Sequence, residues 1–154
     1  MSIEKRLSEL GLELPEAPSI LGLYKPVLVV DGLAYTSGHG PLKPEGGFVT
    51  GRLGDDLGVD EGSAAARMTG LAMLASLKAE LGSLDRVGRL VKTLGLVQAT
   101  PDFAAHPAVI NGFSELMRDA LGDEAGVAAR SAFGAASLPA GWAVEIEAVF
   151  TVCD

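Results

Sequence analysis

The apolar and polar positions in the first third of the chain predict a short helix followed by three strands. Apolar residues spaced i, i+4, i+7 near the N-terminus predict an amphipathic helix over residues 2–10, and a proline-containing leader continues beyond it. Asp31-Gly32 separates two β-rich runs and suits the positive φ angles of a tight hairpin. The predicted strands of this part lie at residues 27–30, 33–37 and 48–50.

Two longer helical patterns follow. The first ends at Leu81 before Gly82, and Asp60 and Ser63 are its candidate N-caps. Gly70 inside it costs about 1 kcal/mol relative to alanine, which indicates close packing at that point. The second helix begins with proline and spans residues 107–121. The remaining strands are predicted at residues 89–97, 128–135 and 143–152.

The resulting order, β-β-β-α-β-α-β-β, predicts one α+β domain over residues 1–154, with residues 1–16 as an N-terminal helix and leader. One sheet with two long helices on one face is the economical packing. In the last strand, alternate residues from Val144 to Val152 are apolar and should meet the helices. The other face mixes Glu145 and Glu147 with apolar groups, which favours contact with another subunit.

Composition excludes several classes of protein. Of 154 residues, 48% are hydrophobic and 21% are charged, as in globular proteins, so a disordered chain is excluded. The 12 basic and 20 acidic residues give a net charge of −8, and no long Lys/Arg cluster is present, which argues against a nucleic-acid partner. One cysteine and two histidines provide no Cys/His metal constellation. With no signal-like N-terminus or membrane-length apolar segment, we expect a cytoplasmic protein without a membrane partner.

Several short motifs then point to a family. Toward the C-terminus these are Ala129-Arg130-Ser131, Leu138-Pro139 and the run Val144-Glu-Ile-Glu-Ala148. Upstream are Ala17-Pro18-Ser19 with Gly22 and Tyr24, the strand end Tyr35-Thr-Ser-Gly-His-Gly-Pro41, Val91-Lys92-Thr93, and Asn111. Together, over about residues 15–152, the chain resembles the reactive-intermediate deaminase family, also called Rid or YjgF.

The resemblance implies a chorismate-mutase-like α+β fold assembled as a homotrimer. In that assembly the sheets line an interior barrel, the helices lie outside, and three sites form in clefts between subunits. The implied activity is hydrolysis of enamine and imine intermediates, such as 2-aminoacrylate, to 2-keto acids and ammonia. The implied partner is thus a small anionic imino or keto acid, and the chemistry needs neither a cofactor nor a metal, because a protonated imine carbon is already electrophilic.

The resemblance also assigns the two catalytic roles. Arg130 can hold a substrate carboxylate with two parallel charge-assisted hydrogen bonds. The alternative for Arg130 is a surface arginine paired with an acid. Glu145 can orient or deprotonate the attacking water, and its alternative is a solvated strand carboxylate.

Four further residues are candidates for substrate binding. Tyr24 can close the pocket by stacking or through its hydroxyl, or it can simply pack. Asn111 can contact the ligand or cap a helix start. Gly38 allows close approach of the backbone to a ligand or forms a turn. His39 stands where many relatives carry glutamine.

Some positions depart from the family pattern. Ala132 stands where well-studied deaminases carry cysteine, and the stretch over residues 100–109 is longer than the usual loop. These departures predict a divergent subgroup with a different imine substrate. Two alternatives to an imine hydrolase stay open. One is a regulatory trimer that binds a small carboxylate without turnover. The other is an endoribonuclease, against which the net charge argues.

Overall fold

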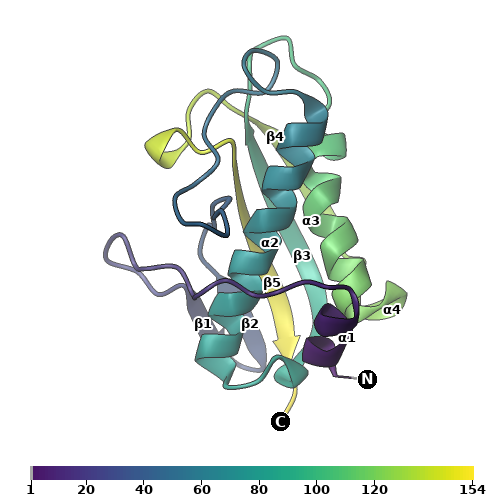
Figure 1. Cartoon of the computed structure of the whole chain (residues 1–154). Helices are drawn as coiled ribbons and strands as arrows, with labels where there is room; N and C mark the ends of the chain where they lie inside the picture. Colours follow the sequence, from purple (N-terminus) through teal and green to yellow (C-terminus); the bar gives the residue numbers. More distant parts are fainter. Residues whose placement is uncertain (1) are drawn as a thin grey trace.

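The computed structural model describes residues 2–154; Met1, included in the predicted domain, lies outside the described residues. Figure 1 shows two long helices lying side by side on one face of a twisted sheet. The helices are α1 (Ile3–Glu9), α2 (Val59–Leu81), α3 (His106–Leu121) and α4 (Asp123–Gly126). The strands are β1 (Val27–Val30), β2 (Leu33–Thr36), β3 (Val87–Gln98), β4 (Ala129–Ala135) and β5 (Val144–Val152).

The five strands form one sheet in the order β1-β2-β5-β3-β4. Only β3 and β4 pair in parallel, since α3 carries the chain back between them, and the other pairs are antiparallel. The predicted hairpin is confirmed: Asp31 and Gly32 have φ angles of 51° and 75°, which a tight primed turn requires. The predicted α+β arrangement, with helices on one face of a sheet, is therefore confirmed.

The two faces of the sheet differ in burial as the last strand predicts. Val144, Ile146 and Phe150 of β5 are fully buried beneath α2 and α3, on what we call the helix face. Glu147 is exposed on the opposite side, which we call the open face. The two long helices approach closely. A Cβ at Gly70 would lie 2.7 Å from the Leu116 side chain, which confirms the packing predicted there.

The structure corrects three predicted element bounds. Residues 48–50 do not form a third strand, because they make only single bridges, from Phe48 to Leu42 and from Thr50 to Trp142. Glycines with positive φ flank this segment and bend the chain away from a continuous ladder. Helix α2 begins one residue before Asp60, with Gly58 as its N-cap and the Glu61 side chain accepting from the Gly58 N–H. Helix α3 begins at His106 rather than at Pro107.

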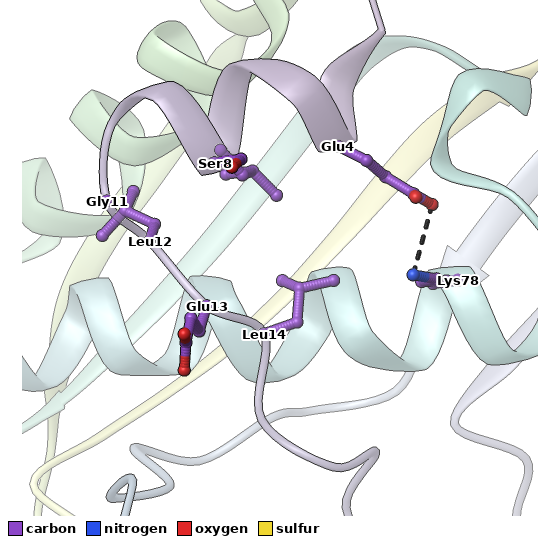
Figure 2. A pocket seen from close by; sticks show the side chains of 8 residues that line it. Glu4, Ser8, Gly11, Leu12, Glu13, Leu14 and Lys78 are labelled. Atoms are coloured by element: carbon purple, nitrogen blue, oxygen red, sulfur yellow. Dashed lines mark ion pairs between the residues drawn. The ribbon is translucent and has the colours of Figure 1, made fainter.

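The N-terminal helix α1 lies against the end of α3, and the leader that follows it crosses α2 (Figure 1). In Figure 2, Glu4 of α1 points toward Lys78 of α2, and their charged atoms lie 3.4 Å apart. Leu12 and Leu14 of the leader pack against the core, and a hollow of about 460 Å³ remains beside them. This exposed ion pair contributes little stability, so the apolar contacts of the leader are its main attachment. Within residues 2–154, no helix has both the length and the apolar composition that a membrane crossing requires.

Candidate active site

A pocket lies beside the start of β5, where the ends of several segments meet. It has a volume of about 260 Å³ and contains three of the predicted site residues, Tyr24, Gly38 and Glu145. We call it the Glu145 pocket. Its other lining residues are Leu21, Ser37, Pro139 and Trp142. The structure therefore brings together residues that are up to 124 positions apart in the sequence.

Hydrogen bonds from the end of β2 hold this pocket together. The Ser37 hydroxyl donates to the Lys25 carbonyl at 2.6 Å, which fixes the segment that carries Tyr24. The Tyr24 hydroxyl oxygen accepts from the Leu21 N–H at 3.2 Å, and its own proton is left for another acceptor. A side chain at Gly38 would overlap the Glu145 carboxylate, so only glycine permits this close approach. The close approach seen here is to Glu145, and contact of Gly38 with a ligand stays a prediction.

Glu145 itself is half-buried at the edge of the pocket. Burial raises the pKa of its carboxyl above the ordinary 4.5, and repulsion from nearby Glu147 raises it further. No ion pair within residues 2–154 offers the Glu145 carboxylate a cation. A carboxylate in this state holds a proton more readily than an exposed one, so it is a stronger base than an ordinary glutamate.

His39 is buried and bonded on both sides of its ring. Its Nδ1 lies 2.7 Å from the Ser37 carbonyl, and its Nε2 lies 2.9 Å from the Ser76 hydroxyl. A carbonyl can only accept, so Nδ1 carries a proton, and in the neutral ring Nε2 accepts from the Ser76 hydroxyl. Burial lowers the pKa of His39 below 6.5, although the bond to Ser37 opposes this. The ring is thus used within the protein, and a contact of His39 with substrate stays a prediction.

The other predicted residues, Arg130 and Asn111, lie in a second group. The Arg130 guanidinium donates from Nη1 to the Asn111 side-chain oxygen at 2.8 Å and to the Ser114 hydroxyl at 3.2 Å. Its Nη2 donates to the Pro107 carbonyl at 3.4 Å. We call these four residues the Arg130 cluster. Asn111 lies inside α3, so it does not cap the helix start. Sequence reasoning missed Ser114, which reaches Arg130 because it follows Asn111 by three helical positions.

The Arg130 cluster and the Glu145 pocket lie on opposite faces of the sheet. In β3, Thr93 is the partner of both Arg130 and Ala148, whereas Leu96 is the partner of Glu145. Paired residues share a face, and Thr93 and Leu96 are an odd number of positions apart, so they point to opposite faces. Arg130 therefore lies on the helix face and Glu145 on the open face. One copy of the chain cannot place both side chains on one small molecule.

The guanidinium of Arg130 also lacks an acidic partner. The surface ion pair considered as an alternative is absent, since none of the ion pairs in the described part of the chain includes Arg130. Its three bonds go to neutral acceptors and leave the Nε–H and one Nη2–H of the five donors unused. Nε and Nη2 form one edge of the guanidinium, at which a carboxylate can accept two parallel bonds. Arg130 is thus prepared for an anion that the chain itself does not supply.

Trp142 is a pocket residue whose role the sequence did not reveal. Its ring stacks on Phe48 with centroids 4.7 Å apart. It also lines the Glu145 pocket, and its indole N–H is buried without a protein acceptor. The sequence could not show this, because the pocket forms only when residues near Trp142 meet those near Tyr24. Within residues 2–154, no three His, Cys, Asp or Glu side chains gather closely enough to hold a metal ion.

Comparison with known proteins shows which family has this sequence and fold. Residues 4–146 match the family model described as "YjgF/chorismate mutase-like, putative endoribonuclease". The chain belongs to this family. It is 40% identical over 147 residues to Protein TCP17 of Trypanosoma cruzi, a match that covers 96% of the chain and 92% of TCP17. The predicted family resemblance is therefore confirmed.

Solved structures of family members support the same assignment. A "putative endoribonuclease" of Shewanella oneidensis MR-1 is 31% identical, with a TM-score of 0.93 over 99% of this chain and all of that one. RidA of an Antarctic Psychrobacter species is 25% identical, with a TM-score of 0.60 over 91% of this chain and 97% of RidA. The lower similarity to RidA fits a divergent branch of the family.

Proposed function

We propose that the protein hydrolyses small 2-imino acids and their enamine tautomers, of the 2-aminoacrylate type, to 2-keto acids and ammonia. The observation that carries the proposal is the position of Arg130 and Glu145 on opposite faces, each without a partner of opposite charge. The site is completed where the Arg130 cluster of one copy meets the Glu145 pocket of another. Membership of the family that includes RidA supports this chemistry.

The open face of the sheet supports contact between copies. Leu28, Tyr35 and Phe133 leave between 42% and 50% of their surface exposed on this face, an unusually apolar set for a solvated sheet. By register, Val149 and Glu145 belong to the same face. A ring of three copies joins two different surfaces of each copy, so it brings the Arg130 cluster of one copy to the Glu145 pocket of the next. We propose the trimer that the family resemblance implies.

The chemistry assigns each group one task. The free edge of Arg130 binds the substrate carboxylate, and the Asn111 amide nitrogen, whose oxygen is already used by Arg130, donates to the ligand. An enamine first takes a proton from solvent at its terminal carbon and becomes the iminium ion. Glu145 accepts a proton from water as the water oxygen bonds to the iminium carbon, and it then passes this proton to the nitrogen. The hydroxyl gives its proton back to Glu145 as the carbonyl forms, the C–N bond breaks and ammonia leaves, and Glu145 returns the proton to solvent. The Tyr24 hydroxyl, whose oxygen already accepts from the Leu21 N–H, donates a hydrogen bond to the substrate.

Subunit mixing tests this site directly. Arg130→Ala and Glu145→Gln should each lower imine hydrolysis by about 100-fold or more, because a charged hydrogen-bonding group is lost. Arg118→Ala, which removes an exposed arginine of α3, is the matched control and should keep wild-type activity. The two inactive variants are then unfolded together and refolded at equal amounts. Random assembly should restore roughly a quarter of the sites, because a site is active only when its Arg130 comes from a Glu145→Gln copy and its Glu145 comes from an Arg130→Ala copy.

Two results would overturn the proposal. If the mixture stays as inactive as its components, the site does not combine Arg130 and Glu145 from different copies. If the wild-type protein binds pyruvate or 2-oxobutanoate, seen as a rise in melting temperature, but never accelerates ammonia release, it is a carboxylate-binding regulator instead. Salt-sensitive RNA binding would favour the endoribonuclease alternative, which the net charge of −8 disfavours.

A further inference from the structure

His106, the first residue of α3, lies over the edge strand β4 in the same strip of the helix face as Arg130. In the parallel register with β3, Arg130, Ala132 and Gly134 occupy alternate positions of β4 and therefore point to the same side. A Cβ at Gly134 would lie 2.8 Å from Nε2 of His106. The absence of a side chain at Gly134 thus lets the imidazole rest directly on the strand.

The imidazole of His106 is held in place by packing, and both of its ring nitrogens are without a hydrogen bond within residues 2–154. Phe103 meets it edge-on, with ring centroids 5.1 Å apart and planes at 85°, and this contact restricts the orientation of the ring. Within residues 2–154, no hydrogen bond engages either ring nitrogen of His106. His39, by contrast, has both ring nitrogens engaged. The ring of His106 therefore keeps a hydrogen-bond donor for a ligand.

The surroundings of His106 favour an acceptor or an anion. Pro107, the next residue, accepts from the Arg130 guanidinium, so the two side chains belong to one strip. No acidic residue occupies the first turn of α3, where the helix dipole adds positive partial charge. Along β4, Ala132 separates Arg130 from Gly134 and contributes only a methyl group. Along this strip, the donors of Arg130 at one end and of His106 at the other are separated by the small apolar surface of Ala132.

We infer that His106 sets the substrate preference of this site toward 2-imino acids whose side chain ends in a carboxylate or an amide. This inference rests on the proposed function. Arg130 holds the carboxylate next to the imine carbon, the substrate side chain passes over Ala132, and its terminal oxygen accepts a hydrogen bond from His106. His106 is a specificity-determining residue and takes no part in the proton transfers.

Two imino acids of similar size test the inference. Amino-acid oxidases generate 2-iminoglutarate from glutamate and 4-methyl-2-iminopentanoate from leucine, and ammonia release is followed for each. The wild-type protein should prefer 2-iminoglutarate. His106→Leu should lower kcat/KM for 2-iminoglutarate by about tenfold or more, mainly through KM, because one hydrogen bond to a charged group is lost. The same variant should change kcat/KM for 4-methyl-2-iminopentanoate by less than about twofold, within the usual effect of a tolerated substitution.

Two further variants separate specificity from structure. His106→Gln retains an N–H donor and should recover part of the preference, which a packing role would not explain. Gly134→Ala keeps the histidine but displaces its ring, since the new Cβ would overlap Nε2. It should therefore shift the preference in the same direction as His106→Leu. Equal losses on both substrates in His106→Leu, or no preference in the wild type, would overturn the inference.

A binding measurement keeps this test independent of turnover. Calorimetry compares 2-oxoglutarate with 4-methyl-2-oxopentanoate, the products of the two reactions. If the wild type hydrolyses neither imine but binds 2-oxoglutarate more tightly, and His106→Leu removes that difference, the proposed hydrolysis fails while the role of His106 stands. If the wild type binds both products equally or binds neither, the inference about His106 is wrong.

Discussion

Arg130 and Glu145 belong to one sheet and point away from each other across it. The partner of Arg130 in β3 is Thr93 and that of Glu145 is Leu96, which fixes the two side chains on opposite faces. The helix face is filled by α2 and α3, so Arg130 meets a ligand only at the edge of the sheet, next to α3.

The pH dependence of hydrolysis should reflect the ionisation of Glu145. Its carboxyl must be ionised to accept a proton, so kcat/KM should fall as the pH decreases through its raised pKa, with a midpoint above 4.5. Glu147→Gln removes the neighbouring negative charge and should move that midpoint to lower pH while activity is kept. A midpoint that stays in place would show that Glu147 does not act on Glu145.

The buried His39 should make the fold sensitive to acid. Its pKa is lowered in the folded protein, so the unfolded chain binds the proton more readily. Its contribution to stability is therefore complete above pH 6.5 and is lost as the pH falls from 6.5 toward the lowered pKa. His39→Gln can keep the bonds to Ser37 and Ser76 without titrating. Its melting temperature should fall less than that of the wild type between pH 7 and pH 5.5, and parallel curves would contradict this prediction.

Gly112 and Gly70, which both lie at the contact between α2 and α3, should differ in how well they tolerate substitution by alanine. A Cβ at Gly112 would overlap the backbone carbonyl of Ser63, which cannot move without separating the helices. At Gly70 the nearest atom is the end of the Leu116 side chain, which can shift. Urea denaturation should therefore show a loss of about 2–4 kcal/mol for Gly112→Ala and about 1 kcal/mol or less for Gly70→Ala, since alanine also favours the helix. Ala64→Gly, an exposed change on α2, should cost about 1 kcal/mol and serves as the control.

The apolar open face should be required for assembly. Phe133 is half exposed in the isolated chain, and Phe133→Asp places a charge where we propose that copies meet. Light scattering should show a shift from trimer to monomer, with the circular dichroism of the fold kept and hydrolysis lost. Leu10→Asp, at a similarly exposed residue that follows α1 as its C-cap, should leave the trimer and its activity unchanged. A wild-type protein that is monomeric at all concentrations would exclude a site shared between copies.

Much of the fold could be predicted from local patterns. Asp31-Gly32 predicted the hairpin, because few other dipeptides accept two positive φ angles. Gly82 marks the end of one helix, and the alternation along residues 144–152 predicts which side of β5 is buried. The predicted third strand at residues 48–50 is wrong, because the glycines with positive φ on both sides of it allow only single bridges.

The sequence by itself determined the family, since the motifs around Arg130 and Glu145 are local and mark it, and it named the residues to which we assign the proposed chemistry. Only the tertiary structure decided where those residues point. The alternation along β5 predicts its buried side, but β4 carries no such pattern, and only its register with β3 places Arg130 on the helix face. That register comes from contacts between distant parts of the chain, which no local pattern contains. The same contacts bring Trp142 to Tyr24 and His106 to Gly134.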